Sequence, residues 1–330
     1  MREILSYLFE YKRLTIQEAE EILIEIANGK HSDSEIAAFI TVFNMRTISI
    51  DELAGFRNAL LKTCIPIDLS EFNAIDLCGT GGDGKDTFNI STLSAFVVAG
   101  AGATVAKHGN YAASSGCGSS NVMEYLGYKF SNDHDHLRKE LDTCGITFLH
   151  APLFNPAMKN VAPVRRALRL KTFFNMLGPM VNPGRPQNQI VGVFSLELAR
   201  MYNYLYQKSE VNYAIIHSLD GYDEISLTGD FKILTNKSDR IISPSELGMR
   251  AVKAEELAGS GDVPGTAAIF MNVLQGKGSV AQNSAVIANS AMALATYFPA
   301  KGLEECLEAA KSSLLGGKAL NVFNNLIAKQ

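Results

Sequence analysis

The first seventy residues carry hydrophobic positions at the spacing of amphipathic helices. After Thr15, hydrophobic residues recur three or four positions apart as far as Ile26, and Asn28-Gly29 then gives a stop signal. The same spacing follows Ser32 and Ser49. Each of these hydroxyl residues has a glutamate three positions later, which is the capping box of a helix N-terminus. The pattern predicts a small bundle of short helices.

From residue 74 onward, short hydrophobic runs alternate with segments of helical spacing. Such runs are typical of strands that are buried on both faces. We predict strands at 74–78, 103–106, 189–193 and 213–216, and helices from about Ser91 and at 121–126, 283–296 and 303–314. The alternation of strand and helix predicts an α/β domain with a central, mostly parallel sheet.

The expected fold class is therefore α/β, with a small helical domain hinged to a larger α/β domain. A length of 330 residues allows about two domains. We place the helical domain at residues 1–70 and the α/β domain at 71–330. Residues from about 155 to 187 interrupt the alternation with helical and Pro/Gly-rich sequence, and we interpret them as an excursion back into the helical domain.

Composition narrows the class of protein. The chain is 47% hydrophobic and 19% charged with a net charge of −4, which is ordinary for a globular protein and argues against a nucleic-acid partner. It has no hydrophobic run long enough to span a membrane and no signal peptide. Five cysteines without a C-x-x-C pair indicate a reducing compartment, so we expect a cytoplasmic protein.

The strand predicted at 74–78 runs into a glycine-rich segment, residues 79–92. A glycine-rich turn between a strand and a helix presents backbone N–H groups to an anion. The dinucleotide-binding pattern fits only in part, because it needs an acidic residue where Lys107-His108-Gly109-Asn110 stands. The Walker A pattern also fails, because Asp86 replaces its hydroxyl residue. The segment predicts a phosphate-binding loop without either nucleotide fold.

Other polar groups support a phosphorylated ligand. Asn89, Ser91 and Thr92 lie at the predicted helix start, where they either serve an anion site or simply cap the helix. Lys107 ends the second strand, and the polar segment 111–120 after it is interpreted as a second phosphate-binding loop.

An acidic pair follows the strand predicted at 213–216. Asp223 and Glu224 stand on a turn, from which both carboxylates can reach one Mg²⁺ or its waters. A solvated turn is the alternative interpretation.

Together these motifs resemble the anthranilate phosphoribosyltransferase family over essentially the whole chain. The order and spacing of the motifs carry the resemblance. The markers are Gly79-Thr80-Gly81-Gly82-Asp83, Asn89-Ile90-Ser91-Thr92, Lys107-His108-Gly109-Asn110, Ser114-Ser115, Gly118-Ser119, Asn155-Pro156-Ala157-Met158-Lys159, Phe174-Asn175, Leu177-Gly178-Pro179 and Asp223-Glu224.

The resemblance implies an activity and an assembly. The activity is transfer of phosphoribose from phosphoribosyl pyrophosphate (PRPP) to the amine of anthranilate, with release of pyrophosphate, in tryptophan biosynthesis. The implied fold is that of the nucleoside-phosphorylase-like transferases, assembled as a homodimer through the helical domain. Mg²⁺ is implied as cofactor, with two ions per active site, and catalysis is expected to rest on positioning and metal rather than on a dedicated catalytic side chain.

The resemblance also implies site residues by their position in the motifs. The implied metal ligands are Ser91, Asp223 and Glu224, and the residues implied to contact anthranilate are Gly79, Asn110 and Arg165. Those implied to bind PRPP are Gly79, Gly82, Asp83, Thr87, Asn89, Ile90, Ser91, Thr92, Lys107, His108, Gly109, Asn110, Tyr111, Ala112, Ala113, Ser114, Ser115 and Ser119.

Two positions depart from the family, and two other functions stay open. Tyr111 stands where the family usually has Arg, and Asn155 where it usually has His. A pyrimidine nucleoside phosphorylase would share the fold without a metal, which the pair Asp223-Glu224 disfavours. A non-catalytic nucleic-acid-binding relative would show a basic groove, which a net charge of −4 disfavours.

Overall fold

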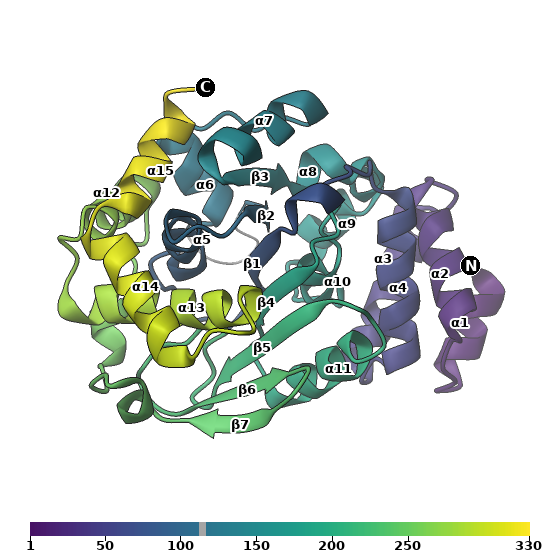
Figure 1. Cartoon of the computed structure of the whole chain (residues 1–330). Helices are drawn as coiled ribbons and strands as arrows, with labels where there is room; N and C mark the ends of the chain where they lie inside the picture. Colours follow the sequence, from purple (N-terminus) through teal and green to yellow (C-terminus); the bar gives the residue numbers. More distant parts are fainter. Residues whose placement is uncertain (112–116) are drawn as a thin grey trace. The chain divides into compact units, whose positions relative to one another are not determined.

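The computed structural model describes residues 1–111 and 117–330 (Figure 1). The implied PRPP-binding residues Ala112, Ala113, Ser114 and Ser115 therefore lie outside the described residues. The chain divides into a helical unit, residues 1–67 and 151–183, and an α/β unit, residues 68–150 and 184–330. The sequence analysis placed the corresponding breaks at 70, 155 and 187.

The helical unit contains four N-terminal helices and the short helices of its second segment. Thr15, Ser32 and Ser49 each form the predicted capping box, with Glu18, Glu35 and Glu52 respectively. The helices are α1 (Arg2–Phe9), α2 (Ile16–Ala27), α3 (Asp33–Met45), α4 (Ile50–Thr63), α8 (Ala151–Phe154), α9 (Ala162–Leu168) and α10 (Phe174–Leu177), with 3-10 turns at Pro156–Asn160 and Gly178–Met180.

Aromatic rings join the two segments of the helical unit. Phe39 of α3 and Phe56 of α4 contact each other with ring centroids 5.9 Å apart. Phe173, just before α10, stacks on Phe56 at 4.5 Å. Burying these rings against one another, rather than in water, stabilises the packing of residues 151–183 on the N-terminal helices.

The α/β unit is built on a seven-stranded sheet of order β3-β2-β1-β4-β5-β6-β7. Its strands are β1 (Ile75–Gly79), β2 (Val105–Gly109), β3 (Ile146–His150), β4 (Asn188–Gly192), β5 (Asn212–Ser218), β6 (Phe231–Thr235) and β7 (Asp239–Ile242). Its helices are α5 (Ile90–Gly100), α6 (Ser119–Tyr125), α7 (His134–Cys144), α11 (Leu196–Tyr206), α12 (Val263–Leu274), α13 (Val280–Tyr297), α14 (Leu303–Leu315) and α15 (Lys318–Ile327).

Strands β1 to β5 run parallel, and β6 and β7 are antiparallel at one edge. The chain moves from β1 outward to β3 in one direction and from β4 outward to β7 in the other. Right-handed crossovers then place α5 and α11 on opposite faces of the sheet (Figure 1). The order reverses between β1 and β4, and this switch point is where ligands bind in open α/β sheets.

The main core lies between the sheet and the helices α5, α13, α14 and α15, which Figure 1 shows gathered on one face. Phe96 of α5 is fully buried in this core and contacts Phe148, Phe270 and Phe323 at centroid distances of 5.5 to 6.1 Å. In residues 1–111 and 117–330, no helix has the length and hydrophobicity needed to cross a bilayer.

The α/β fold class predicted from the sequence is confirmed, but the inventory of strands is incomplete. The four predicted strands are β1, β2, β4 and β5, displaced by one to three residues at their ends. Strand β3 and the hairpin of β6 and β7 were not predicted. In β7 only Ile242 is buried, so this strand has no hydrophobic run to reveal it.

Candidate active site

Two glycines face each other at the switch point of the sheet. Gly79 ends β1 and Gly192 ends β4, and the two are paired in the register of the strands. A Cβ at residue 192 would lie 1.5 Å from the backbone oxygen of Asp223, and one at residue 79 would lie 2.5 Å from its carboxylate. Only glycine therefore leaves room for the turn that carries the acidic pair.

The acidic pair is buried and faces the glycine-rich loop. Asp223 is 7% and Glu224 is 8% exposed. The backbone N–H of Gly81 donates to Oδ2 of Asp223 at 2.6 Å. Ser91 donates its backbone N–H at 2.9 Å and its hydroxyl at 2.7 Å to Oε1 of Glu224, and the Thr87 hydroxyl donates to Oε2 at 3.1 Å. The structure thus brings the three predicted metal ligands together and excludes the solvated turn.

Negative charge accumulates at this position without a cationic partner. Burial and the neighbouring carboxylates of Glu224 and Asp83 raise the pKa of Asp223 well above its ordinary value. Burial also raises the pKa of Glu224, although the hydrogen bonds from Ser91 oppose the shift. None of the ion pairs within residues 1–111 and 117–330 includes either carboxylate.

The donor set fits Mg²⁺. Carboxylate and hydroxyl oxygens are the hard ligands that this ion prefers, and Mg²⁺ sites shared with phosphates use only one or two carboxylates. No group of three or more His, Cys, Asp or Glu residues that could hold a metal occurs in the described part of the chain. A Mg²⁺ held here would therefore complete its coordination with a ligand or with water.

The glycine-rich loop connects β1 to α5 and is anchored by its own amides. The backbone N–H of Thr80 donates to Gly192 at 2.9 Å and that of Gly81 to Asp223 at 2.6 Å. Gly81 and Gly82 adopt positive φ angles of 63° and 77°, a conformation that favours glycine. The Asp83 carboxylate accepts the backbone N–H of Lys85 at 3.1 Å. The ammonium of Lys85 in turn lies 4.6 Å from the ring centroid of Tyr222, the residue before the acidic pair. This contact links the loop to the acidic turn, in addition to the bond between Gly81 and Asp223.

The start of α5 does not use its polar residues as simple caps. Asn89 is the N-cap residue with φ of 38°, but its side chain makes no capping bond. Ser91 is bonded to Glu224, and Ile90 and Thr92 are buried. Two buried oxygens at the loop, Oδ1 of Asn89 and Oγ1 of Thr80, have no hydrogen-bond partner among the described residues. Thr80 is a polar group that the predicted site residues left out, although it stands within the glycine motif.

Of the predicted residues at the end of β2, Lys107 and His108 are buried, whereas Asn110, just after the strand, is exposed. Lys107 is 3% exposed, and its ammonium donates to the backbone oxygen of Leu77 in β1. The backbone N–H of His108 donates to Asp76 at 3.0 Å. The backbone oxygen of Asn110 accepts the hydroxyl of Ser119 at 3.3 Å, which holds the end of β2 against the start of α6.

Tyr111 makes a local contact network in place of the family's usual arginine. Its hydroxyl donates to Glu124 of α6 at 2.7 Å, and this bond raises the pKa of Tyr111 to about 12. Its ring meets His150 edge-on with centroids 4.7 Å apart. Burial lowers the pKa of His150, whose Nδ1 lies 3.0 Å from the hydroxyl of Ser120. Tyr111 therefore ties the end of β2 to α6 and β3 without adding a positive charge.

Arg165 belongs to the helical unit, whereas Gly79 and Asn110 belong to the α/β unit. Its guanidinium lies 5.3 Å from the ring centroid of Phe174 and donates to Oδ1 of Asn175 at 3.4 Å. Burial lowers the pKa of Arg165, and no ion pair of the described residues includes it. Asn155, the second departure from the family, is buried in the same unit.

The two units and the site between β1 and β4 define the class of protein as a glycosyl transferase. The family described as "Glycosyl transferase family, a/b domain" matches residues 71–320, and "Glycosyl transferase family, helical bundle domain" matches residues 2–64.

Relatives and solved structures identify the branch of that class. The chain is 58% identical to the anthranilate phosphoribosyltransferase of Christiangramia forsetii, over 99% of this chain and 98% of the relative. The crystal structure of anthranilate phosphoribosyltransferase from Thermus thermophilus is similar with a TM-score of 0.91 at 30% identity, over 98% of both chains. The Saccharomyces cerevisiae enzyme in complex with PRPP and Mg has a TM-score of 0.90 at 25% identity, over 98% of this chain and 96% of that one. The chain belongs to the anthranilate phosphoribosyltransferase family and is a transferase.

Proposed function

We propose that the protein transfers the 5-phosphoribosyl group of PRPP to the amine of anthranilate, giving N-(5-phosphoribosyl)anthranilate and pyrophosphate in tryptophan biosynthesis. The observation that carries the proposal is the buried acidic pair, which faces a glycine-rich loop at the switch point of the sheet. This arrangement suits a ligand that brings both a metal and a pyrophosphate.

The metal site would be held by Ser91, Asp223 and Glu224. Mg²⁺ bound there supplies charge stabilisation for the departing pyrophosphate. We propose two ions per active site, since the two carboxylates point to different parts of the loop, Asp223 to Gly81 and Glu224 to Ser91.

The glycine-rich loop and its surroundings would bind PRPP. Backbone amides at Gly79, Gly82 and Asp83 suit phosphate oxygens, because glycine lets the backbone approach closely. The unpartnered oxygens of Asn89 and Thr80 suit hydroxyl groups of the ribose or ordered water. The other residues proposed to contribute are Thr87, Ile90, Thr92, Lys107, His108, Gly109, Asn110, Tyr111, Ala112, Ala113, Ser114, Ser115 and Ser119.

Arg165 would bind the carboxylate of anthranilate, with Gly79 and Asn110 as further contacts. A half-buried guanidinium whose described contacts are a ring and an amide, with no carboxylate, is poised for an anionic ligand. Its planar fork can hold a carboxylate with two parallel hydrogen bonds. The amine of anthranilate attacks as the neutral species, so orientation of the two substrates carries the rate and no general base is required.

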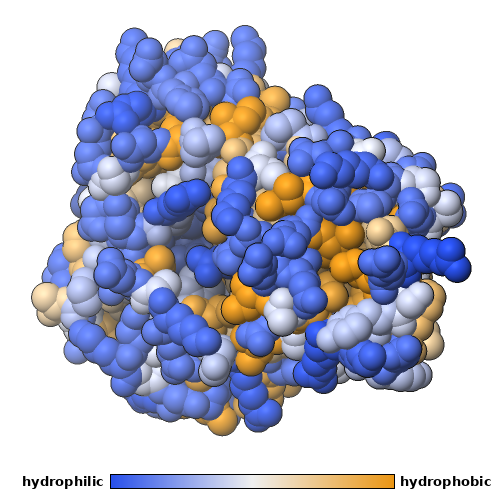
Figure 2. Space-filling view, turned by 90° about the vertical axis from the view of Figure 1, so that its right-hand side faces the viewer, coloured by the Kyte–Doolittle hydropathy of each residue, from blue (hydrophilic) through white to orange (hydrophobic). Residues whose placement is uncertain are grey.

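We also propose that the protein is a cytoplasmic homodimer. None of the five cysteines, all of which lie in the described residues, is joined in a disulfide, which suits a reducing compartment. Large hydrophobic side chains are exposed on the helical unit, with Phe9 at 63% and Met45 at 78%. Figure 2 shows hydrophobic areas lying among hydrophilic residues on one face of the molecule. A helix-mediated dimer would cover such side chains, and sedimentation equilibrium gives the mass that tests it.

The function is tested by following anthranilate fluorescence after addition of PRPP and Mg²⁺. The fluorescence should fall with time, and a chelator should stop the change. The double variant Asp223→Ala, Glu224→Ala should lose activity at low Mg²⁺ and recover in part at high Mg²⁺. Phosphate-dependent cleavage of a pyrimidine nucleoside, with no use of anthranilate, would favour the phosphorylase alternative instead. Neither that alternative nor the nucleic-acid-binding one is supported by the relatives reported above.

A further inference from the structure

The acidic turn, residues 223–226, belongs to neither a strand nor a helix. Regular backbone hydrogen bonds therefore do not fix the positions of Asp223 and Glu224. A small cavity of about 20 Å³ lies beside the two carboxylates. Something else must hold this turn if both carboxylates are to face the glycine-rich loop.

The side chain of Asn289 on α13 holds the turn as a neighbouring strand would. Its Oδ1 accepts the backbone N–H of Ile225 at 3.0 Å, and its Nδ2 donates to the backbone oxygen of Ile225 at 2.9 Å. A second Nδ2 bond, to Ala285 of the same helix at 2.8 Å, fixes the orientation of the amide. Both polar atoms of Asn289 are thus used, and Ile225 directly follows the acidic pair.

A hydroxyl group completes the attachment from the other side. Ser218, the last residue of β5, donates to the backbone oxygen of Glu224 at 2.6 Å and accepts the backbone N–H of Ser226 at 3.3 Å. Asn289 is 7% exposed and Ser218 is fully buried. Side chains from the framework of the α/β unit therefore hold the turn at three successive residues, Glu224, Ile225 and Ser226.

We propose that Asn289 is a positioning residue that sets the metal affinity of the acidic turn. The proposal rests on the proposed function, in which Asp223 and Glu224 hold Mg²⁺. Asn289 acts by fixing the backbone of Ile225, so that the two preceding carboxylates meet the loop at Gly81 and Ser91. Ser218 supports the same turn through Glu224.

The test measures Mn²⁺ binding directly, by electron paramagnetic resonance in the presence of pyrophosphate. Asn289→Ala should weaken Mn²⁺ binding by roughly tenfold or more, as removal of groups that orient metal ligands commonly does. The Mg²⁺ concentration needed for half-maximal activity should rise in step, while the KM for anthranilate stays within a few-fold. Ser218→Ala should also weaken Mn²⁺ binding. If Asn289→Ala is too unstable to purify, the Mn²⁺ affinity of Ser218→Ala tests whether attachment of the acidic turn sets the metal affinity.

Ser290→Ala is the matched control. Ser290 is the next residue on α13 and is fully buried, and its hydroxyl donates to Val286 of its own helix at 2.7 Å. This variant should lose thermal stability while binding Mn²⁺ as tightly as the unmodified protein. Equal Mn²⁺ binding by Asn289→Ala and the unmodified protein, or equal weakening in Ser290→Ala, would overturn the proposal. Failure of the unmodified protein to bind Mn²⁺ would instead overturn the proposed function, and this inference with it.

Discussion

At the scale of single residues, the helical unit and the α/β unit each hold charges that are withdrawn from water and lack counter-ions among the described residues. Arg165 is half-buried beside a ring and an amide, and the pair Asp223-Glu224 is buried beside backbone amides and hydroxyls. Burying unpaired charge is costly in a protein that binds nothing. Each position therefore marks where a substrate or metal of opposite charge is expected.

Arg165→Ala should raise the KM for anthranilate and leave the KM for PRPP within a few-fold. A charge-assisted hydrogen bond contributes about 1.5–3 kcal/mol, so the expected loss is roughly tenfold to over a hundredfold. Arg165→Lys should restore only part of the loss, because an ammonium lacks the planar fork. Steady-state kinetics with each substrate varied in turn measures both constants.

Arg166→Ala is the control for this prediction. Arg166 is the neighbouring residue on α9 and is exposed, so its removal should have a mild effect. Equal damage at both arginines, or damage confined to PRPP, would show that another residue binds the carboxylate. Asn110 would then be the next residue to replace.

Gly79→Ala should reduce the affinity for Mg²⁺ and PRPP while leaving anthranilate binding less affected. The added Cβ would lie 2.5 Å from Oδ2 of Asp223, so the carboxylate must move away from Gly81. Isothermal titration with Mg²⁺ and pyrophosphate measures the change. Gly302→Ala, where a Cβ would meet nothing within 4 Å, should bind both as before. A Gly79→Ala protein with unchanged affinity would contradict the placement of the metal.

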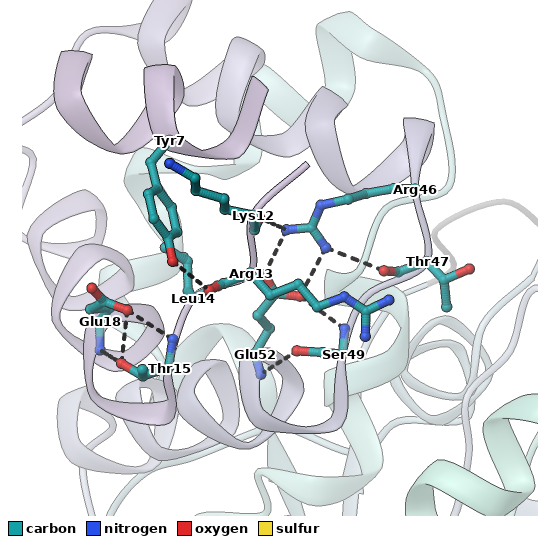
Figure 3. Close-up of polar contacts among 10 residues, drawn as sticks. All are labelled: Tyr7, Lys12, Arg13, Leu14, Thr15, Glu18, Arg46, Thr47, Ser49 and Glu52. Atoms are coloured by element: carbon teal, nitrogen blue, oxygen red, sulfur yellow. Dashed lines mark hydrogen bonds and ion pairs between the residues drawn. The ribbon is translucent and has the colours of Figure 1, made fainter. Parts of the chain in front are cut away.

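At the scale of elements, a buried ion pair joins two connections of the helical bundle (Figure 3). Glu52 of α4 is fully buried, and its carboxylate accepts hydrogen bonds from Nη2 and Nη1 of Arg46 at 2.6 and 2.9 Å. The same carboxylate accepts the backbone N–H groups of Leu14 and Ser49. One side chain therefore fixes the link between α1 and α2 against the link between α3 and α4.

Arg46→Ala should destabilise the protein by about 3–5 kcal/mol, because it leaves the Glu52 carboxylate buried without its cation. Urea unfolding monitored by circular dichroism measures the loss. Lys62→Ala is the control. The side chain of Lys62 is 63% exposed in its pair with Glu20, and this pair should contribute less than about 1 kcal/mol. Similar losses of unfolding free energy in both variants would show that burial does not make the Arg46–Glu52 pair more stabilising than the Lys62–Glu20 pair.

The pH dependence of the same interaction has a definite sign. Burial raises the pKa of Glu52, but hydrogen bonds from Arg46, Ser49 and Leu14 outweigh it, so the pKa lies below the ordinary value of 4.5. The stabilisation by this carboxylate is therefore complete above 4.5 and is lost as the pH falls through the pKa of the folded protein. The difference in unfolding free energy between the unmodified protein and Glu52→Gln should shrink over that range. A difference that grows on acidification would contradict the assignment.

Local sequence signals predicted many of the helices and strands. The features that these signals missed depend on contacts between residues far apart in the sequence. The capping boxes at Thr15, Ser32 and Ser49 were predictable because all their contacts lie within one helical turn. The acidic pair was predictable from residue type and from its place after a strand. The contact of Asn289 with Ile225 could not be predicted from the sequence. The two residues are 64 positions apart, and they meet only because of how α13 packs on the sheet.

At the scale of the whole molecule, we expect the acidic pair to lower the stability of the metal-free protein, although the proposed function requires it. Asp223→Asn should raise the thermal stability of the metal-free protein, because it removes one of two buried neighbouring negative charges and an amide oxygen can still accept from Gly81. A gain of 1 kcal/mol corresponds to roughly 2–4 °C in the melting temperature of a protein of 150–250 residues. Differential scanning calorimetry without metal measures it.

The same variant should lose the stabilisation that ligands give. In the unmodified protein, Mg²⁺ with pyrophosphate at a hundredfold excess over the dissociation constant should add about 2.7 kcal/mol. Asp223→Asn should gain much less under the same conditions and should have little transferase activity. A variant that is less stable than the unmodified protein without metal would contradict this trade-off.

The paired glycines at the ends of β1 and β4 also limit which substitutions this sequence can accept during evolution. In a library randomised at residue 192 and selected for growth of a tryptophan-requiring host, survivors should carry glycine, since any side chain would begin 1.5 Å from the backbone oxygen of Asp223. At residue 229, where a Cβ would meet nothing within 4 Å, the same selection should accept many residues. The diversity recovered at each glycine codon would then measure the space opposite it.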